Sequence, residues 1–115
     1  MFDFQKLDVY QKSKRFYIDT RAIISESKLD NYIKDQLYRA AFSVPLNLAE
    51  GSGKFSKADR KNYYTTARAS IYECIAIMDI LNDEKKVSES FYQSQLKHAD
   101  ELSRILYAMI QTLHS

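Results

Sequence analysis

The sequence predicts an all-α protein, an antiparallel up-down-up-down four-helix bundle formed by one domain over residues 1–115. Four segments repeat apolar residues at spacings of three and four, which is the period of an amphipathic helix. The chain has 2 glycines and 1 proline, too few for a turn-rich sandwich or barrel. The connections between the segments are short, which favours antiparallel neighbours.

The first helix is expected over residues 3–24, with Asp3 as its N-cap. Two adjacent strips share its inner side: Val9, Ser13, Phe16, Thr20 and Ile23, and beside them Tyr10, Tyr17 and Ile24. The second helix is expected over residues 31–49, with Asp30 as its cap. Its inner stripe comprises Ile33, Leu37, Ala40, Val44 and Leu48. Pro45 lies inside this pattern, so we expect a kink near residues 41–44 without a break in the helix.

The third helix is expected over residues 56–81, where Ser56 and Asp59 resemble a capping box. Its seam has the spacing of a bundle helix and comprises Tyr64, Ala67, Ile71, Cys74, Met78 and Leu81. Asn82 follows directly and tolerates the left-handed conformation that ends helices. The fourth helix is expected over residues 88–113 with the inner residues Tyr92, Ala99, Leu102, Leu106, Met109 and Leu113.

Two of these helices carry a second apolar face. Its members are Tyr38, Phe42, Pro45, Leu46 and Ala49 on the second helix, and Ala69, Tyr72, Ala76 and Ile80 on the third. Soluble monomers rarely expose so much apolar surface, so we expect a homo-oligomer. Its interface is expected to include Tyr38, Phe42, Leu46, Tyr72, Ala76 and Ile80. The alternative is a skewed bundle that buries wide faces within one chain.

A polar strip lies between the two apolar faces of the second helix and comprises Gln36, Arg39, Ser43, Asn47 and Glu50. Polar groups flanked by apolar surface need hydrogen-bond partners, and Arg68, Ser70 and Glu73 on the third helix are candidates. One interpretation is a structural network that determines register. The other is a ligand site or the lining of a channel.

Catalytic signals are weak, and we expect no enzymatic activity, no cofactor and no metal. His98 and His114 lack a ligand-spaced Cys or His, and Cys74 lies on the inner seam as a small apolar residue. The glycines at 51 and 53 fit the end of the second helix and a tight turn better than a phosphate loop. A single cysteine, no signal peptide and no membrane-length apolar run favour a cytoplasmic protein without membrane contact.

Basic residues gather between the second and third helices. Residues 51–68 contain Lys54, Lys57, Arg60, Lys61 and Arg68 against one acid, Asp59. Lys57, Lys61 and Arg68 share a stripe with Tyr64 and Tyr72 beside it, and basic groups with aromatics suit phosphates and unstacked bases. We therefore expect nucleic-acid contacts from Lys54, Lys57, Lys61 and Arg68. A second basic group comprises Lys12, Lys14, Arg15 and Arg21. The alternative is that these charges only solvate helix faces.

Residues 35–54, with Ser56, resemble the signature of the bacterial four-helix bundle proteins first associated with intervening sequences in large-subunit ribosomal RNA genes. The core of this signature is Ser-x-Pro-x-Asn-x-Ala-Glu-Gly, from Ser43 to Gly51. Residues 67–73 resemble its second signature, and the stretch from Phe4 to Tyr10 resembles the family's start. By position, the polar signature comprises Arg39, Ser43, Asn47, Glu50, Ser70 and Glu73. Tyr38 stands where a second basic residue is usual, and Lys54 where Arg is frequent.

The resemblance implies an antiparallel bundle that assembles into a five-fold ring. It also implies kinship with accessory proteins of diversity-generating retroelements, which bind a reverse transcriptase and nucleic acid. Together with the basic residues, it favours a non-enzymatic oligomeric scaffold that engages RNA or an RNA–protein complex. The alternative is a protein-interaction adaptor with no nucleic-acid role.

Overall fold

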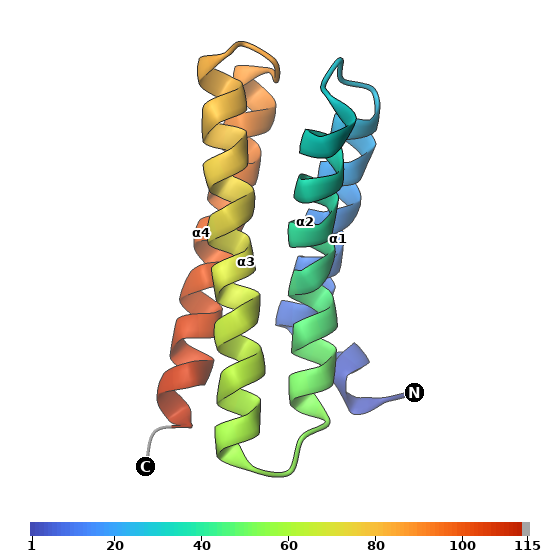
Figure 1. Ribbon diagram of the computed structural model, residues 1–115. Coiled ribbons are helices and arrows are strands. Elements are labelled where there is room, and N and C mark those ends of the chain that lie inside the picture. The colour runs from blue at the N-terminus through green and yellow to red at the C-terminus, as the bar shows by residue number, and fades with distance from the viewer. Residues whose placement is uncertain (114–115) are drawn as a thin grey trace.

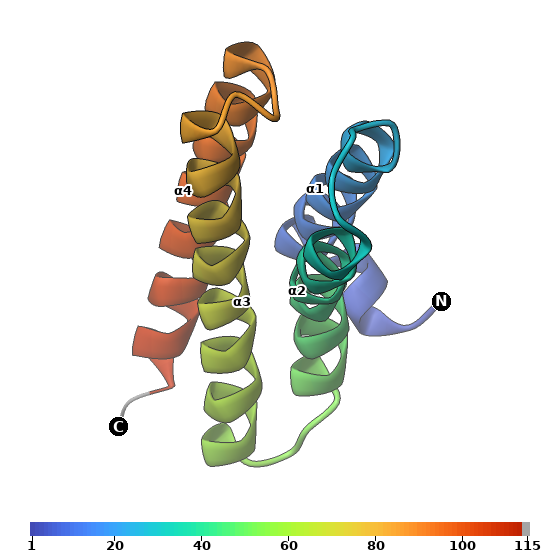
Figure 2. The ribbon, with the colours of Figure 1, turned by 45° about the horizontal axis from the view of Figure 1, so that its top comes forward.

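The computed structural model describes residues 1–113, and these form a short 3-10 helix followed by four α-helices. The elements are η1 (Asp3–Lys6), α1 (Asp8–Ser25), α2 (Asn31–Ser52), α3 (Lys57–Asp83) and α4 (Glu89–Thr112). Figures 1 and 2 show the helices running alternately up and down beside one another. Each helix contacts the next along the chain, and α4 packs back against α1. The all-helical class is confirmed, and within residues 1–113 no segment forms a strand.

The inward stripes of the four helices meet in one core. The seam expected on α3 is buried along its whole length, from Tyr64 to Leu81. Leu37 and Leu48 on α2 and Leu102 and Leu106 on α4 face it. Each fully buried side chain of this size contributes about 1.5–3 kcal/mol relative to an exposed one. The continuous stripes therefore account for the helix pairing.

The start of the first helix was predicted wrongly. Asp3 begins η1, and α1 begins at Asp8 after Leu7, whose backbone is extended. The side chain of Gln5 accepts a hydrogen bond from the Phe2 amide at 2.8 Å, which holds the 3-10 turn. Ile23, placed in the inner row, is 43% exposed, while Ile24 is buried, because the row continues from Thr20 by a step of four.

The second helix continues through Pro45 and extends beyond residue 49 to Ser52. Asp30 is the N-cap residue, but within the described chain its carboxylate accepts no capping hydrogen bond. The glycines lie at the helix end and turn, as expected: Gly51 is in the last helical turn, Gly53 is the C-cap residue with a right-handed backbone, and the Lys54 amide donates to the Gly51 carbonyl oxygen at 3.1 Å. A Cβ atom on Gly51 would lie 2.8 Å from Cε1 of Tyr64. Gly51 is therefore needed for the close approach of α2 to α3.

The caps of α3 and α4 follow the sequence pattern. The Ser56 hydroxyl accepts a hydrogen bond from the Asp59 amide at the start of α3. At the start of α4, the hydroxyl of the N-cap residue Ser88 accepts one from the Phe91 amide. Asn82 does not end α3 in a left-handed conformation, because the helix continues to Asp83. The left-handed residue is Lys85, with φ of 59°. In residues 1–113, no helix combines the length and apolar content of a membrane span.

Candidate nucleic-acid interface

The surface of α3 is divided into two halves of opposite charge. The basic half, which includes the preceding turn, carries Lys54, Lys57, Arg60, Lys61 and Arg68. The acidic half, residues 73–84, carries Glu73, Asp79, Asp83 and Glu84 and has no basic residue. The basic half lies at the end of the bundle where the α2–α3 turn is found, and the acidic half lies toward the opposite end (Figure 1). The basic half therefore offers a polyanion a concentration of positive charge that residues 73–84 lack.

Contacts between the turn and the first part of α3 hold Lys54 and Arg60 in place. Nε of Arg60 donates to the Lys54 carbonyl oxygen at 2.7 Å, which ties the turn to the helix. Nζ of Lys54 lies 5.2 Å from the ring centroid of Tyr63, within cation–π range. Lys57 is exposed and Lys61 half-buried along the same helix. The arrangement presents positive groups from an ordered backbone, so less entropy is lost when they bind phosphate.

Arg68 joins α3 to α4. Its Nε donates to the Ser103 carbonyl oxygen at 3.1 Å, and its Nη2 donates to the Tyr72 hydroxyl at 3.1 Å. Its guanidinium carbon lies 5.0 Å from the ring centroid of Tyr72 and 5.5 Å from that of Tyr107. We call Arg68, Tyr72 and Tyr107 the Arg68 cluster. Both rings remain more than half exposed, so the cluster combines a fixed cation with accessible aromatic faces.

Tyr107 was not identified from the sequence, because it lies off the inner row of α4 and nothing in the spacing pairs it with a residue of α3. Tyr64, placed beside the basic stripe, is 7% exposed and belongs to the core. Its hydroxyl lies 3.3 Å from Oγ of Ser52. Tyr64 is therefore not accessible for stacking on a base, whereas the exposed ring of Tyr107 has its centroid 5.5 Å from the guanidinium carbon of Arg68.

The polar strip of α2 is only partly brought together with α3. Oγ of Ser70 donates to Oγ of Ser43 at 2.9 Å, and Nδ2 of Asn47 donates to the same Ser43 oxygen at 2.8 Å. Arg68 does not join this strip, because it points to α4. The remaining members are more open, and Glu50 is exposed. A groove of about 390 Å³ is lined by Tyr32, Asp35, Gln36, Arg39 and Glu73.

The residues expected at an oligomer interface fall in more than one region. Tyr38 lies under the guanidinium of Arg21 at 4.5 Å, and the Phe42 ring is 5.0 Å from that of Tyr17. Helix α1 therefore covers part of the second face of α2. Phe42 and Leu46 are still 47% and 42% exposed in one chain. On α3, Tyr72 and Ile80 are both more than half exposed and Ala76 is exposed.

A buried polar contact between α1 and α4 was also missed. Nε2 of Gln95 donates to Oγ1 of Thr20 at 2.8 Å and to the Phe16 carbonyl oxygen at 3.4 Å. Its Oε1 lies 3.3 Å from Nδ1 of His98. Gln95 lies three residues after Tyr92 and four before Ala99, so it belongs to the inner row of α4. A polar residue in this apolar row was the sequence signal that could have predicted a buried hydrogen bond. The contact specifies how α1 and α4 pair.

The thiol of Cys74 lies in the core of the bundle. Cys74 is fully buried, and burial raises the pKa of its thiol to about 12, so the nucleophilic thiolate is disfavoured. Within residues 1–113 there is no group of three or more His, Cys, Asp and Glu side chains that could hold a metal ion. His114 lies outside the described residues.

The comparison with protein families gives a match to the model of the 23S rRNA-intervening sequence protein family over residues 5–108. The chain belongs to this family. A solved structure of a protein of unknown function from the S23 ribosomal protein family, from Bacteroides thetaiotaomicron, has the same fold with a TM-score of 0.83. The two are 20% identical, and the match covers 89% of this chain and 97% of that chain. No curated protein matches the sequence. The matched residues include the whole basic half and all three residues of the Arg68 cluster.

Proposed function

We propose that this family member is a non-enzymatic homo-oligomer that binds structured RNA, or an RNA–protein complex, through the basic half of α3. The observation that carries the proposal is the concentration of Lys54, Lys57, Lys61 and Arg68 in the turn before α3 and in the first half of that helix, with two of these cations resting on exposed or half-buried tyrosine rings. Phosphate contacts supply most of the sequence-independent affinity for nucleic acids. The family's name, which refers to 23S rRNA, supports RNA as the polyanion.

Oligomerisation strengthens such binding because it repeats the basic half around one particle. A single chain has a net charge of +2, which is modest for an RNA-binding protein. The exposed side chains of Phe42, Leu46 and Ile80 supply apolar area for contacts between copies. A ring of five copies, which the resemblance implies, would bring five basic ends together.

The test of RNA binding uses charge reversal with a matched control. Lys57→Glu combined with Lys61→Glu is compared with Lys86→Glu combined with Lys97→Glu, which changes the same charge away from the basic half. Fluorescence anisotropy measures binding to a structured RNA at low and moderate salt. We expect the first pair to weaken binding about tenfold or more at low salt and the second to have little effect.

Two results would contradict RNA binding. The first is absence of wild-type affinity at low salt, and the second is an equal loss in both pairs of variants. Copurification of a partner protein whose binding is unaffected by RNA would support the adaptor alternative instead.

The test of self-association is light scattering at micromolar concentration. We expect a particle several times the 13.5 kDa mass of one chain. Phe42→Glu or Ile80→Glu should shift the mass toward that of one chain, because each places a charge in an apolar contact. A wild-type particle of 13.5 kDa would contradict the oligomer.

A further inference from the structure

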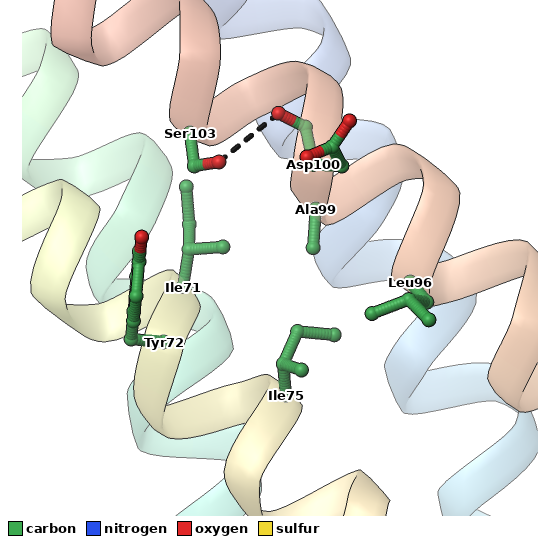
Figure 3. A pocket seen from close by; sticks show the side chains of 7 residues that line it. All are labelled: Ile71, Tyr72, Ile75, Leu96, Ala99, Asp100 and Ser103. Carbon is green, nitrogen blue, oxygen red and sulfur yellow. Dashed lines mark hydrogen bonds between the residues drawn. The ribbon is translucent and has the colours of Figure 1, made fainter.

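A hollow of about 180 Å³ lies between α3 and α4, next to the Arg68 cluster (Figure 3). Its floor is apolar and comprises Ile71, Ile75, Leu96 and Ala99. Tyr72, Asp100 and Ser103 complete its lining, and Tyr72 and Asp100 are exposed. In Figure 3 the aliphatic side chains of the two helices converge on this space, and Ser103 donates to the Asp100 carbonyl oxygen. The site thus has an apolar interior and a polar edge.

The size of the hollow restricts what it can hold. An apolar cavity of roughly 150 Å³ binds benzene, whereas cofactor and drug sites span about 300–1,000 Å³. The hollow therefore matches one six-membered ring. Among the parts of an RNA chain, a pyrimidine base has this size, and its faces are apolar enough to lie against Ile75 and Leu96.

The edge of the hollow offers complementary charge for a nucleotide. Arg68 is bonded to Ser103 and Tyr72, both of which line the hollow. A guanidinium has five N–H groups, so donors remain beyond these two bonds for a phosphate oxygen. Asp100 presents a carboxylate, which only accepts hydrogen bonds, and Nε of Arg104 holds its Oδ2 at 3.0 Å. Acidic side chains select the N4 amino group of cytosine among pyrimidines.

We propose that the hollow binds an unpaired cytosine of RNA, with the base between α3 and α4, the phosphate on Arg68 and the N4 amino group on Asp100. This inference rests on the proposed function and adds a nucleotide preference to it. Uracil presents the acceptor O4 at the same position, which faces the carboxylate unfavourably. Tyr107, beside Arg68, offers a second ring on which the neighbouring base stacks.

The experiment compares labelled single strands of oligo(C) and oligo(U) of equal length with a fully paired RNA hairpin, by fluorescence anisotropy at one salt concentration. We expect the wild type to bind oligo(C) about fivefold or more tightly than oligo(U). Ser103→Leu fills the hollow and should remove this preference while leaving hairpin binding unchanged. Ser94→Leu, on an exposed part of α4 outside the hollow, is the matched control. Asp100→Asn should bring oligo(C) and oligo(U) to near parity, because an amide can also donate to O4.

The outcomes separate this inference from the proposed function. Equal wild-type affinity for oligo(C) and oligo(U), or no effect of Ser103→Leu, overturns the nucleotide site. If the hairpin still binds and Lys57→Glu with Lys61→Glu weakens it, the proposed function stands. If Ser103→Leu leaves RNA binding unchanged but lowers the particle mass, the occupant is a second copy of the chain, which also overturns the inference. Absence of binding to all three RNAs overturns both proposals.

Discussion

The two halves of α3 are alike inside and opposite outside. Tyr64 and Ala67 in the first half and Met78 and Leu81 in the second are all buried in the same seam. On the surface, the first half carries five basic residues with its turn, and residues 73–84 carry four acidic ones. The fold needs the seam in both halves, and one outer charged group of each half also bonds to α4: Arg68 donates to the Ser103 carbonyl oxygen, and Asp79 accepts from the Tyr92 hydroxyl. The two halves still differ in the sign of their charge, which gives the bundle a direction along which RNA is attracted or repelled.

Truncation of the seam in the acidic half should have the largest effect on the fold. Met78 is fully buried, so Met78→Ala leaves a cavity and should lower the free energy of unfolding by about 2–5 kcal/mol. Chemical denaturation followed by circular dichroism measures this loss. While the variant remains folded, RNA affinity should be unchanged, because the basic half is intact. A loss of affinity in the folded variant would show that the two halves are not separable.

Close packing at the basic half should be the next most sensitive feature. Gly51→Ala places a Cβ atom 2.8 Å from Cε1 of Tyr64 and should destabilise the protein by about 1–3 kcal/mol. Gly53→Ala is the control, since a Cβ atom there would meet nothing closer than the Glu50 carbonyl oxygen at 3.6 Å. Thermal melts of the two variants check the difference. Equal melting temperatures would mean that α2 and α3 can separate at no cost.

The hydrogen bond between Thr20 of α1 and Gln95 of α4 tests the stability of a helix pair that does not involve α3. Thr20→Val removes the hydroxyl that accepts from Gln95 and leaves a buried amide without this partner, at a cost of about 1–3 kcal/mol. Gln95→Leu in the same chain should recover much of the loss, because both polar groups are then gone. Urea denaturation of the single and double variants measures the coupling. Additive losses would contradict a specific pair.

The sequence predicted the four helices well where a long apolar stripe dominated. The α3 seam is the best case, because a continuous run of spacings of three and four leaves one way to bury it. Local details depended on contacts that are distant in sequence. The sequence placed Gly51 and Gly53 at the end of α2 and the following turn, but it did not show that the Tyr64 ring on α3 requires the small size of Gly51. Lys85 adopts the left-handed conformation in place of Asn82, because α3 continues to Asp83.

In the candidate site, too, the features set by one helix could be predicted from the sequence, and the contacts between helices could not. The spacing of Lys57, Lys61 and Arg68 identified a basic stripe, which one helix determines by itself. The contact of Arg68 with Tyr107 and Ser103 depends on the packing of α4, which the spacing of α3 does not contain. Tyr64 was assigned to both the seam and the basic stripe, and the seam prevailed because it buries a large ring in the core.

Neutralising the acidic half should have the smallest effect, and it should raise RNA affinity instead of lowering it. Glu73→Gln combined with Asp83→Asn removes two repulsive charges from an exposed surface. We expect RNA affinity to rise a few-fold at low salt, with the gain lost at high salt as screening increases. The same titrations by anisotropy measure it. A fall in affinity would show that the acidic half contacts the RNA directly.

Binding through the basic half is tested most directly by the salt dependence of RNA affinity. Replacing Lys57 and Lys61 by Gln removes two phosphate contacts, so the slope of log affinity against log salt should decrease in magnitude by roughly 1.4–1.8. The same replacement at Lys86 and Lys97 should leave the slope unchanged. An unchanged slope in the first pair, with RNA still bound, would contradict the assignment of the basic half as the RNA-binding surface.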